Sequence, residues 1–443
     1  MSAAPNGITS SARTPPVAGL VIGGDYRGLG AVRSLGRHGV PVDVLYDGDH
    51  PLAAASRFAR RRLAWPAGDD ARLALLIRLA EREGHFGSVL IPSSDEVVAF
   101  IGRNHAQLAT RYRLTTPRWD RLQWAHDKRR LHDLADGAGV ARPWTAYPAE
   151  GEDITRLARD FPMVIKPVSH EAMNPLAHDK AWRVDDRRTL AARYAEARAF
   201  LPAEQVMLQE LIPGGGESQY SYGAIVDEGR PLAEVVVRRL RQYPMDFGRL
   251  STFVETVDEP AVAEDSRRLL AAARYTGLIE IEFKRDPRDG RLKVLDANPR
   301  IWGWHTLTQR TGPDFVHLLY RLLTDAPVAS EPAPPGLRWA RLDADLAASA
   351  RDLLAGRMPL GAYAASLAGR VESAIFAADD PLPGVVALGQ LELMAITGVR
   401  GRLAAALRRA APSAQTLPNH AADLLAPQGT VRPAGEQPVR AGQ

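Results

Sequence analysis

The stretch Leu278-Ile-Glu-Ile-Glu-Phe-Lys-Arg-Asp-Pro-Arg-Asp-Gly-Arg-Leu-Lys-Val-Leu-Asp-Ala-Asn-Pro-Arg300 has the pattern of a β-hairpin. Apolar residues at 279, 281 and 283 alternate with Glu280 and Glu282, which is the two-residue period of a half-buried strand. Residues 286–290 are typical of a turn, because Pro presets φ and Gly accepts a positive φ. Residues 292–297 would form the return strand.

The carboxylates of this stretch would converge on one face of the hairpin. Pairing of Arg285 with Arg291 would place Glu280 opposite Asp296 and Glu282 diagonal to it, about 7–8 Å away. Like charges that face each other are destabilising unless a cation lies between them, and oxygen ligands of this kind suit Mg²⁺. The sequence therefore predicts a metal site, although a solvated charged face would have the same pattern. Its ligands would be Glu282, Asp296 and Asn298.

The composition is that of a globular protein with several domains. The chain has 443 residues, 45% of them hydrophobic and 24% charged, and no cysteine, which excludes disulfides and thiolate metal sites. No apolar run is long enough to span a membrane, and residues 1–16 lack the apolar core of a signal peptide. The net charge is only +4 and no basic arm is present, so nucleic acid is not an expected partner. We expect a cytoplasmic protein.

Lysine is rare in this chain. Of the 56 lysine and arginine residues only five are lysine, at positions 128, 166, 180, 284 and 293. Where any positive charge suffices the chain uses arginine, so a lysine could mark a place that needs a compact ammonium group. Lys293 could equally be an ordinary surface residue.

The N-terminal part has the pattern of a parallel α/β domain. Apolar strands at 17–22 and 40–46 flank a glycine-rich segment, 23–30, and a helix over 31–38. The glycines lack the Gly-x-Gly-x-x-Gly spacing of a dinucleotide site, and Asp43 lies inside the second strand. They would permit a tight turn or bind a substrate anion at the helix N-terminus. A dinucleotide-dependent oxidoreductase is the less favoured alternative.

A group of polar residues follows the apolar strand 88–92. Ligands of open α/β sheets bind beyond the carboxyl ends of the strands, so Ser93, Ser94 and Asp95 are candidate substrate contacts. Ser94 or Asp95 would equally serve as the N-cap of a helix over 96–105.

Two later strands and one loop also carry polar residues. Lys166 ends the apolar strand 161–167 and needs an anion or a hydrogen-bond partner there. Strand 206–212 carries Glu210 and ends at a Pro-Gly-Gly-Gly run. Three arginines in the predicted loop that follows residue 237 suggest carboxylate or phosphate binding, although solvated surface arginine is the competing interpretation. They are Arg238, Arg239 and Arg241.

Taken together, residues 123–323 resemble the ATP-grasp superfamily of carboxylate–amine ligases. The chain is most similar to the D-aspartate-ligase-like branch of predicted ATP-dependent carboligases. Three short sequences add to this resemblance: Ile91-Pro-Ser-Ser-Asp-Glu96, Arg241-Gln-Tyr-Pro244 and Asp379-Asp-Pro-Leu-Pro383. The resemblance implies an N-terminal Rossmann-like parallel α/β domain, then an ATP-grasp domain of two α+β subdomains that grip ATP, then a small helical region. Their expected bounds are 17–120, 121–328 and 329–411, between a disordered N-terminus at 1–16 and a disordered tail at 412–443.

The resemblance also implies roles for single residues. Lys128 and Lys166 resemble the phosphate-binding lysines, and Arg300 resembles an arginine that faces the acyl-phosphate or the substrate. The adenine hinge would be Glu210, Leu211 and Ile212, the ribose-binding acid Glu217, and the ligands of Mg²⁺ (or Mn²⁺) Glu282, Asp296 and Asn298. Catalytic roles would fall to Lys128 and Arg300, and substrate contacts to Ser94, Asp95, Arg239, Arg241 and Arg300.

The chain departs from the family pattern in two places. The loop 168–180, which should cover the phosphates, contains no glycine, so Lys180, Ser169 or His170 would serve instead. Asp296 stands where many relatives have Glu, and its shorter side chain would shift the metal or add a bridging water.

The reaction implied is an ADP-forming ligation of a small carboxylate to a small amine, with ATP and Mg²⁺ and without membrane or nucleic-acid partners. A homodimer is the default expectation. The alternatives are a carboxylating or carbamoyl-transferring ATP-grasp enzyme and a nucleotide-binding protein without catalysis.

Overall fold

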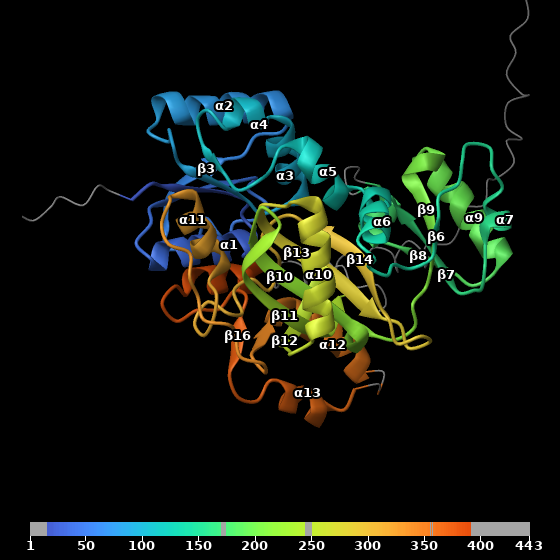
Figure 1. Cartoon of the computed structure of the whole chain (residues 1–443). Helices are drawn as coiled ribbons and strands as arrows, with labels where there is room; N and C mark the ends of the chain where they lie inside the picture. Colours follow the sequence, from blue (N-terminus) through green and yellow to red (C-terminus); the bar gives the residue numbers. More distant parts are fainter. Residues whose placement is uncertain (1–15, 170–173, 244–249, 355, 357, 391–443) are drawn as a thin grey trace, which may run out of the picture. The chain divides into compact units, whose positions relative to one another are not determined.

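Figure 1 shows the computed structural model, which describes residues 16–169, 174–243, 250–354, 356 and 358–390. The expectations for residues 1–15 and 391–443 lie outside this part, as do residues 170–173 of the predicted phosphate loop and residues 244–249 after the arginines. Within the described residues, no helix combines the length and the apolar character needed to cross a membrane.

A parallel sheet of five strands comes first, as the sequence predicts. Its elements are β1 (Gly19–Ile22), α1 (Tyr26–Arg37), β2 (Val42–Tyr46), β3 (Ala59–Ala64), α2 (Asp69–Arg82), β4 (Val89–Pro92), α3 (Asp95–Arg103), α4 (His105–Leu108), β5 (Arg113–Leu114) and α5 (Trp119–His126). The strand order is β3–β2–β1–β4–β5. The sequence pattern does not predict β3. Three consecutive residues of this edge strand are arginine, so it lacks the apolar pattern by which the other strands are recognised. Asp43 on β2 is buried and accepts a hydrogen bond from Arg60 Nε at 2.8 Å.

The glycine-rich segment 23–30 is a helix start rather than an extended turn. α1 begins at Tyr26, before the predicted 31–38, and the Asp25 carboxylate caps it by accepting from the backbone N–H groups of Arg27 and Gly28, both at 3.1 Å. Gly23 has a φ of 136°, and a Cβ there would lie 1.7 Å from Ser93 Oγ. The chain's own carboxylate thus takes the anion position at this helix N-terminus, which argues against a dinucleotide or substrate anion there.

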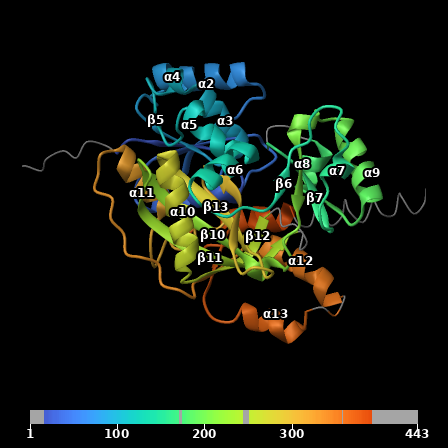
Figure 2. The same ribbon diagram turned by 45° about the vertical axis from the view of Figure 1, so that its right-hand side comes forward.

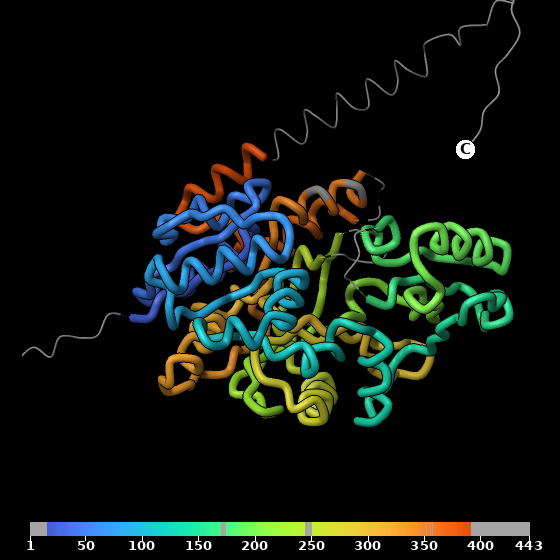
Figure 3. Tube along the Cα trace, turned by 90° about the horizontal axis from the view of Figure 1, so that it is seen from above, coloured from blue at the N-terminus to red at the C-terminus, as the bar shows by residue number. Residues whose placement is uncertain are grey.

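The pair Asp379 and Asp380 anchors the last described residues to α1. Arg33 Nε donates to Asp380 Oδ2 at 2.9 Å, and Ser56 Oγ donates to the same oxygen at 2.7 Å. Arg33 and Asp380 are both buried. Figure 3 shows this orange-red segment beside the blue N-terminal elements.

Replacement of Asp380 by Ala should lower the free energy of unfolding by roughly 3 kcal/mol, because the Arg33 guanidinium would stay buried without its counter-charge. Asp379→Ala is the matched control. Asp379 pairs with Arg37 at an exposed place, where such a pair contributes at most about 1 kcal/mol. Urea denaturation measures both variants, and equal losses would contradict the burial argument.

A four-stranded antiparallel sheet follows. Its region contains α6 (Lys128–Gly137), β6 (Thr145–Ala146), α7 (Ile154–Leu157), β7 (Met163–Pro167), α8 (Pro175–Asp179), β8 (Trp182–Val184), α9 (Arg187–Arg198), η1 (Ala203–Gln205) and β9 (Val206–Glu210). The strand order is β6–β9–β7–β8, with α7, α8 and α9 beside the sheet in Figure 2. Ile165, Leu190 and Leu208 belong to its buried core. β7 and β9 are the predicted strands, each slightly shorter than expected.

The third sheet has seven strands. Its region contains η2 (Gly216–Ser218), β10 (Gln219–Asp227), β11 (Arg230–Tyr243), β12 (Leu250–Thr256), α10 (Pro260–Ala273), β13 (Gly277–Arg285), β14 (Leu292–Asn298), α11 (Phe315–Leu323), β15 (Arg338–Ala340), α12 (Leu342–Leu354), α13 (Leu360–Ser366) and β16 (Val371–Ser373). The strand order is β14–β13–β10–β11–β12–β15–β16. Leu269 of α10 packs in one core with Tyr222 and Ile279 of the sheet.

Two parts of this sheet differ from expectation. Arg238 to Tyr243 continues β11 and is not a loop. The region 329–411, expected to be helical, contributes β15 and β16 as well as α12 and α13. Each of these two strands has three residues, too few for a two-residue period to stand out in the sequence.

The predicted hairpin is present as β13 and β14, but its register differs. Arg285 pairs with Leu292 rather than with Arg291. A shift of one residue would by itself turn Asp296 to the opposite face of the sheet.

A β-bulge corrects the shift. Phe283 pairs with Val294, the register then skips Leu295, and Glu282 lies directly opposite Asp296. Glu280 lies opposite Asn298 and not opposite Asp296 as predicted. The bulge therefore restores the shared face that the predicted metal site requires.

Candidate nucleotide and metal site

One pocket brings many of the predicted residues together. Residues of the four-stranded and the seven-stranded sheets both line it. The predicted residues among them are Lys128, Lys166, Lys180, Glu210, Leu211, Ile212, Arg239, Glu282 and Asp296. The other described residues predicted for the site do not line this pocket: Ser93, Ser94, Asp95, Ser169, Glu217, Arg238, Arg241, Asn298 and Arg300.

Glu282 and Asp296 form the acidic end of the pocket. Lys128 Nζ donates to Asp296 Oδ1 at 2.9 Å, and an Arg239 guanidinium nitrogen lies 3.2 Å from Glu282 Oε2. Burial opposes the charged form of Glu282, but the charges of Arg239 and Lys180 outweigh it and hold the pKa of Glu282 below its ordinary value. Glu282 is therefore anionic at neutral pH.

Glu280 and Asn298 continue the same face. Asn298 Nδ2 donates to Glu280 Oε2 at 3.2 Å and to Glu282 Oε1 at 3.4 Å, and Trp304 Nε1 donates to Glu280 Oε1 at 2.8 Å. Burial and the charge of Glu282 raise the pKa of Glu280 to about 7. Carboxylates that repel each other in this way mark a place where a cation is stabilising.

The donor set fits a Mg²⁺ or Mn²⁺ ion. Two opposed carboxylates and a neighbouring amide supply hard oxygen ligands. Among the described residues, no three His, Asp or Glu side chains are grouped so that they could hold a metal alone. A cation here would therefore complete its shell with phosphate oxygens and water, as Mg²⁺ commonly does. Asn298 Oδ1, which accepts from Arg300 at 3.2 Å, would have to turn toward the ion, so the ligand set stays a prediction.

Lys166 is held by a short chain of hydrogen bonds. Its Nζ donates to Gln209 Oε1 at 2.9 Å, and Gln209 Nε2 donates to Thr145 Oγ1 at 3.1 Å. Burial and the nearby charge of Lys128 lower the pKa of Lys166 to about 8. Two ammonium groups in one pocket attract a polyphosphate, which fits the predicted role of both lysines.

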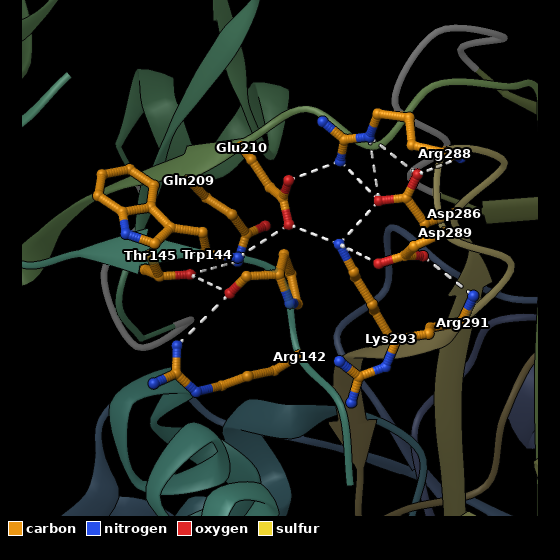
Figure 4. A network of polar contacts seen from close by, with 11 residues as sticks. Arg142, Trp144, Thr145, Gln209, Glu210, Asp286, Arg288, Asp289, Arg291 and Lys293 are labelled. Carbon is orange, nitrogen blue, oxygen red and sulfur yellow. Dashed lines mark hydrogen bonds and ion pairs between the residues drawn. The ribbon is translucent and has the colours of Figure 1, made fainter. Parts of the chain in front are cut away.

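Glu210 is the centre of the polar network in Figure 4. Its carboxylate accepts from the Trp144 N–H at 2.9 Å, from Lys293 Nζ at 2.9 Å and from Arg288 at 2.5 Å. Burial raises the pKa of Glu210, but the hydrogen bonds from Lys293, Trp144 and Arg288 outweigh it and lower the value overall. The side chain of Glu210 thus bonds within the protein, and its backbone N–H also donates, to the Trp144 carbonyl oxygen at 3.0 Å, so the hinge role of residues 210–212 stays a prediction.

Two other predicted nucleotide contacts form hydrogen bonds within the protein. Glu217 Oε1 accepts from the Gly215 N–H at 3.0 Å, and Ser169 Oγ donates to Gln205 Oε1 at 3.2 Å. Lys180 follows α8 with a φ of 66° and lines the pocket. His170 lies outside the described residues. The roles of Glu217 and Lys180 in nucleotide binding stay predictions.

The predicted substrate residues Asp95 and Arg300 bind each other. Arg300 Nε and its terminal nitrogen donate to the two Asp95 oxygens at 2.9 and 3.0 Å. Ser94 is the N-cap of α3 and accepts from the Val97 N–H, which confirms the capping alternative for Ser94. Arg300 also contacts Asn298, so this ion pair adjoins the acidic end of the pocket.

Arg239 and Arg241 occupy different places. Arg239 lines the pocket, whereas Arg241 donates from Nε and from one terminal nitrogen to the two carboxylate oxygens of Asp345 on α12, at 2.8 and 2.7 Å. The Phe253 ring lies 4.1 Å from the Arg241 guanidinium. A β-bulge between the two arginines breaks the alternation of β11. These contacts indicate a structural role for Arg241 rather than substrate binding.

Sequence reasoning gave no role to three residues that the structure brings to the site: Gln209, Lys284 and Lys293. Gln209 and Lys284 line the pocket, and Lys293 is buried against Glu210. Lys293 is thus not a surface residue. The rarity of lysine was the one feature that could have identified two of the three.

Comparisons with known proteins agree on the fold. No protein-family model matches the chain. A 191-residue stretch is 26% identical to the C-terminal section of the large chain of carbamoyl phosphate synthase from Methanopyrus kandleri. That match covers 41% of this chain and 33% of the relative, so the chain spans about a third of its length.

Solved structures extend the likeness over most of the chain. An L-amino acid ligase from Bacillus licheniformis is 16% identical, with a TM-score of 0.54 over 70% of this chain and 75% of that one. The biotin carboxylase domain of the 2-oxoglutarate carboxylase from Hydrogenobacter thermophilus, solved with magnesium ADP and bicarbonate, is 15% identical, with a TM-score of 0.56 over 71% of each chain. The chain therefore shares its fold with this L-amino acid ligase and this biotin carboxylase domain.

Proposed function

We propose that this protein is an ATP-dependent ligase that activates a carboxylate as an acyl-phosphate and joins it to an amine, releasing ADP and phosphate. The observation that carries the proposal is the arrangement of the pocket. Lys128 and Lys166 line the same pocket as the opposed carboxylates of Glu282 and Asp296, and residues 210–212, the predicted hinge, line it too. A polyphosphate with its divalent cation fits between such groups.

The chemistry has two steps, and positioning and charge neutralisation supply most of the catalysis. A carboxylate oxygen of the substrate attacks the γ-phosphorus, and ADP leaves. The amine nitrogen then attacks the acyl carbon, phosphate leaves, and the nitrogen loses a proton. Mg²⁺ bound by Glu282, Asp296 and Asn298 would neutralise the β- and γ-phosphate oxygens. Lys128 and Lys166 would hold the same phosphates.

Arg300 would stabilise the transferring group, and its bond to Asp95 would position it. The pair lies next to Asn298, and the substrate would bind on this side of the acidic end. The D-aspartate-ligase-like branch remains the finer assignment we favour, with a small carboxylate and a small amine as substrates. A cytoplasmic homodimer completes the proposal.

A second candidate is carboxylation or carbamoyl transfer. The sequence match to a carbamoyl phosphate synthase and the likeness to a biotin carboxylase domain favour it. In that reaction bicarbonate would be the carboxylate that is phosphorylated.

A screen of ADP release from magnesium ATP tests both candidates. Amino acids would be supplied singly and in pairs, with and without bicarbonate. A ligase requires a carboxylate and an amine together, and hydroxylamine should trap its acyl-phosphate as a hydroxamate when the amine is omitted. Release with bicarbonate and no added carboxylate would favour the second candidate. Absence of ATP binding by titration would contradict both.

A further inference from the structure

All five lysines of the chain are at or beside the pocket. Lys128, Lys166, Lys180 and Lys284 line it, and Lys293 donates to Glu210, which lines it. The proposed function gives roles to Lys128 and Lys166, and Lys180 is a predicted nucleotide contact. Lys284 and Lys293 are left, and both contact the segment 210–214, which we call the hinge segment.

The contacts of these two lysines reach both ends of the hinge segment. Lys284 Nζ donates to the carbonyl oxygens of Ile212 at 2.9 Å and Gly214 at 2.6 Å. Lys293 Nζ donates to Glu210 Oε1 at 2.9 Å and to Asp286 Oδ2 at 2.7 Å. Only 7% of Lys284 and 8% of Lys293 is exposed to solvent. Figure 4 shows Lys293 pointing from β14 toward Glu210 and Asp286.

The register of the hairpin explains why both side chains point the same way. Lys284 and Lys293 are direct cross-strand partners, so they share one face. The bulge at Leu295 places Lys293 and Asp296 on that face together, although they are three residues apart. In a regular strand their side chains would point to opposite faces.

Two ammonium groups placed opposite each other repel, so other contacts must offset this repulsion. The charge of Lys293 is balanced by the carboxylates of Glu210 and Asp286. The ammonium group of Lys284 donates to two carbonyl oxygens of the hinge segment. A hydrogen bond from a charged donor to a buried carbonyl is strong, and its loss leaves the carbonyl without a partner. The hinge segment is therefore fixed to the same hairpin that carries Glu282 and Asp296.

We propose that Lys284 and Lys293 are positioning residues that hold the hinge segment in the conformation that binds the base of the nucleotide. The inference rests on the proposed function for the identity of the ligand. One hairpin would then set the distance between the base end of the pocket and its acidic end. A compact ammonium suits the position of Lys284, because one nitrogen donates to two carbonyl oxygens there, whereas a guanidinium is larger and holds its donors in a fixed plane.

The experiment compares Lys284→Met and Lys293→Met with wild type in the full chain. The first readout is hydrogen exchange of the peptide that covers the hinge segment, without nucleotide. Exchange should be about tenfold faster in Lys284→Met, because one charged hydrogen-bond donor is lost. The second readout is titration with magnesium ATP, whose dissociation constant should rise about tenfold. At saturating ATP the turnover should stay within about twofold, because the acidic end of the pocket is unchanged.

Arg285→Met is the matched control. Arg285 is next to Lys284 on β13, but it donates to Glu259 at 2.7 Å and does not contact the hinge segment. It should leave hinge exchange and ATP affinity at the wild-type level. Lys284→Arg should behave like Lys284→Met, and full rescue by arginine would overturn the need for an ammonium.

The outcomes separate this inference from the proposed function. Wild-type hinge exchange and ATP affinity in both methionine variants would overturn the inference. If Lys284→Met does not fold, Lys293→Met provides the test of the inference. In that variant Glu210 keeps its contact with Arg288, so its carboxylate still has a charged partner. If the wild type binds no ATP, the proposed function fails, whereas hinge exchange without nucleotide still shows whether the lysines hold the segment.

Discussion

Replacement of Glu282 by Gln, or of Asp296 by Asn, is expected to abolish measurable ADP release while the fold persists. Each change removes one negative charge from the acidic end of the pocket without changing the size of the side chain. The loss of one charged group that acts on the transferring phosphate costs about 3–4 kcal/mol, or roughly 10²–10³-fold in rate. The measurement is coupled-assay ADP release with the substrates found in the screen.

Two controls make this result interpretable. Asp289→Asn removes a carboxylate from the turn of the same hairpin, where Asp289 is about 41% exposed and outside the pocket lining, and it should retain activity. Thermal melting and circular dichroism report the fold. Near-normal ADP release by both active-site variants would refute the assignment of Glu282 and Asp296 as metal ligands.

Replacement of Lys166 by Met is expected to weaken ATP binding about thirtyfold, because a charged donor to the phosphates contributes about 2 kcal/mol. Calorimetric titration with magnesium ATP measures this change. Unchanged affinity would contradict the phosphate role of Lys166. Loss of the side chain also leaves Gln209 Oε1 without its donor, so thermal stability is measured in parallel.

The same lysine predicts how wild-type affinity depends on pH. Burial, together with the charge of Lys128, lowers the pKa of Lys166 to about 8, while Asp296 and Glu282 act in the opposite direction. At a pH below about 8 the Lys166 side chain is a charged ammonium, and this charge is lost as the pH rises through 8. Bound phosphate favours the charged form, so ATP affinity should fall by up to about tenfold per pH unit above the pKa of the free protein.

The pH experiment has its own control. Lys166→Met should show a flatter profile between pH 7 and 9.5 (an interval set by the pKa of about 8), because its side chain does not titrate. Lys166→Arg keeps a charge over this range and should also lose the decline. A decline of equal size in all three proteins would assign the titration to another group.

The sequence determined the local elements of this protein. The alternating apolar residues of 279–283 and the turn at 286–290 define the hairpin, and the buried strands that end at Lys166 and Glu210 are where the pattern places them. Periodicity and turn chemistry depend on neighbours in the chain, so they can be read from one sequence.

Only the tertiary structure decided which side chains meet. The bulge at Leu295 turns Lys293 toward the pocket and keeps Asp296 opposite Glu282, and a second bulge separates Arg239 from Arg241. The partners of Asp95 and Glu210 are Arg300 and Lys293, which lie far along the chain. Bulges and long-range ion pairs depend on how strands from distant segments fit together, and no local pattern carries that information.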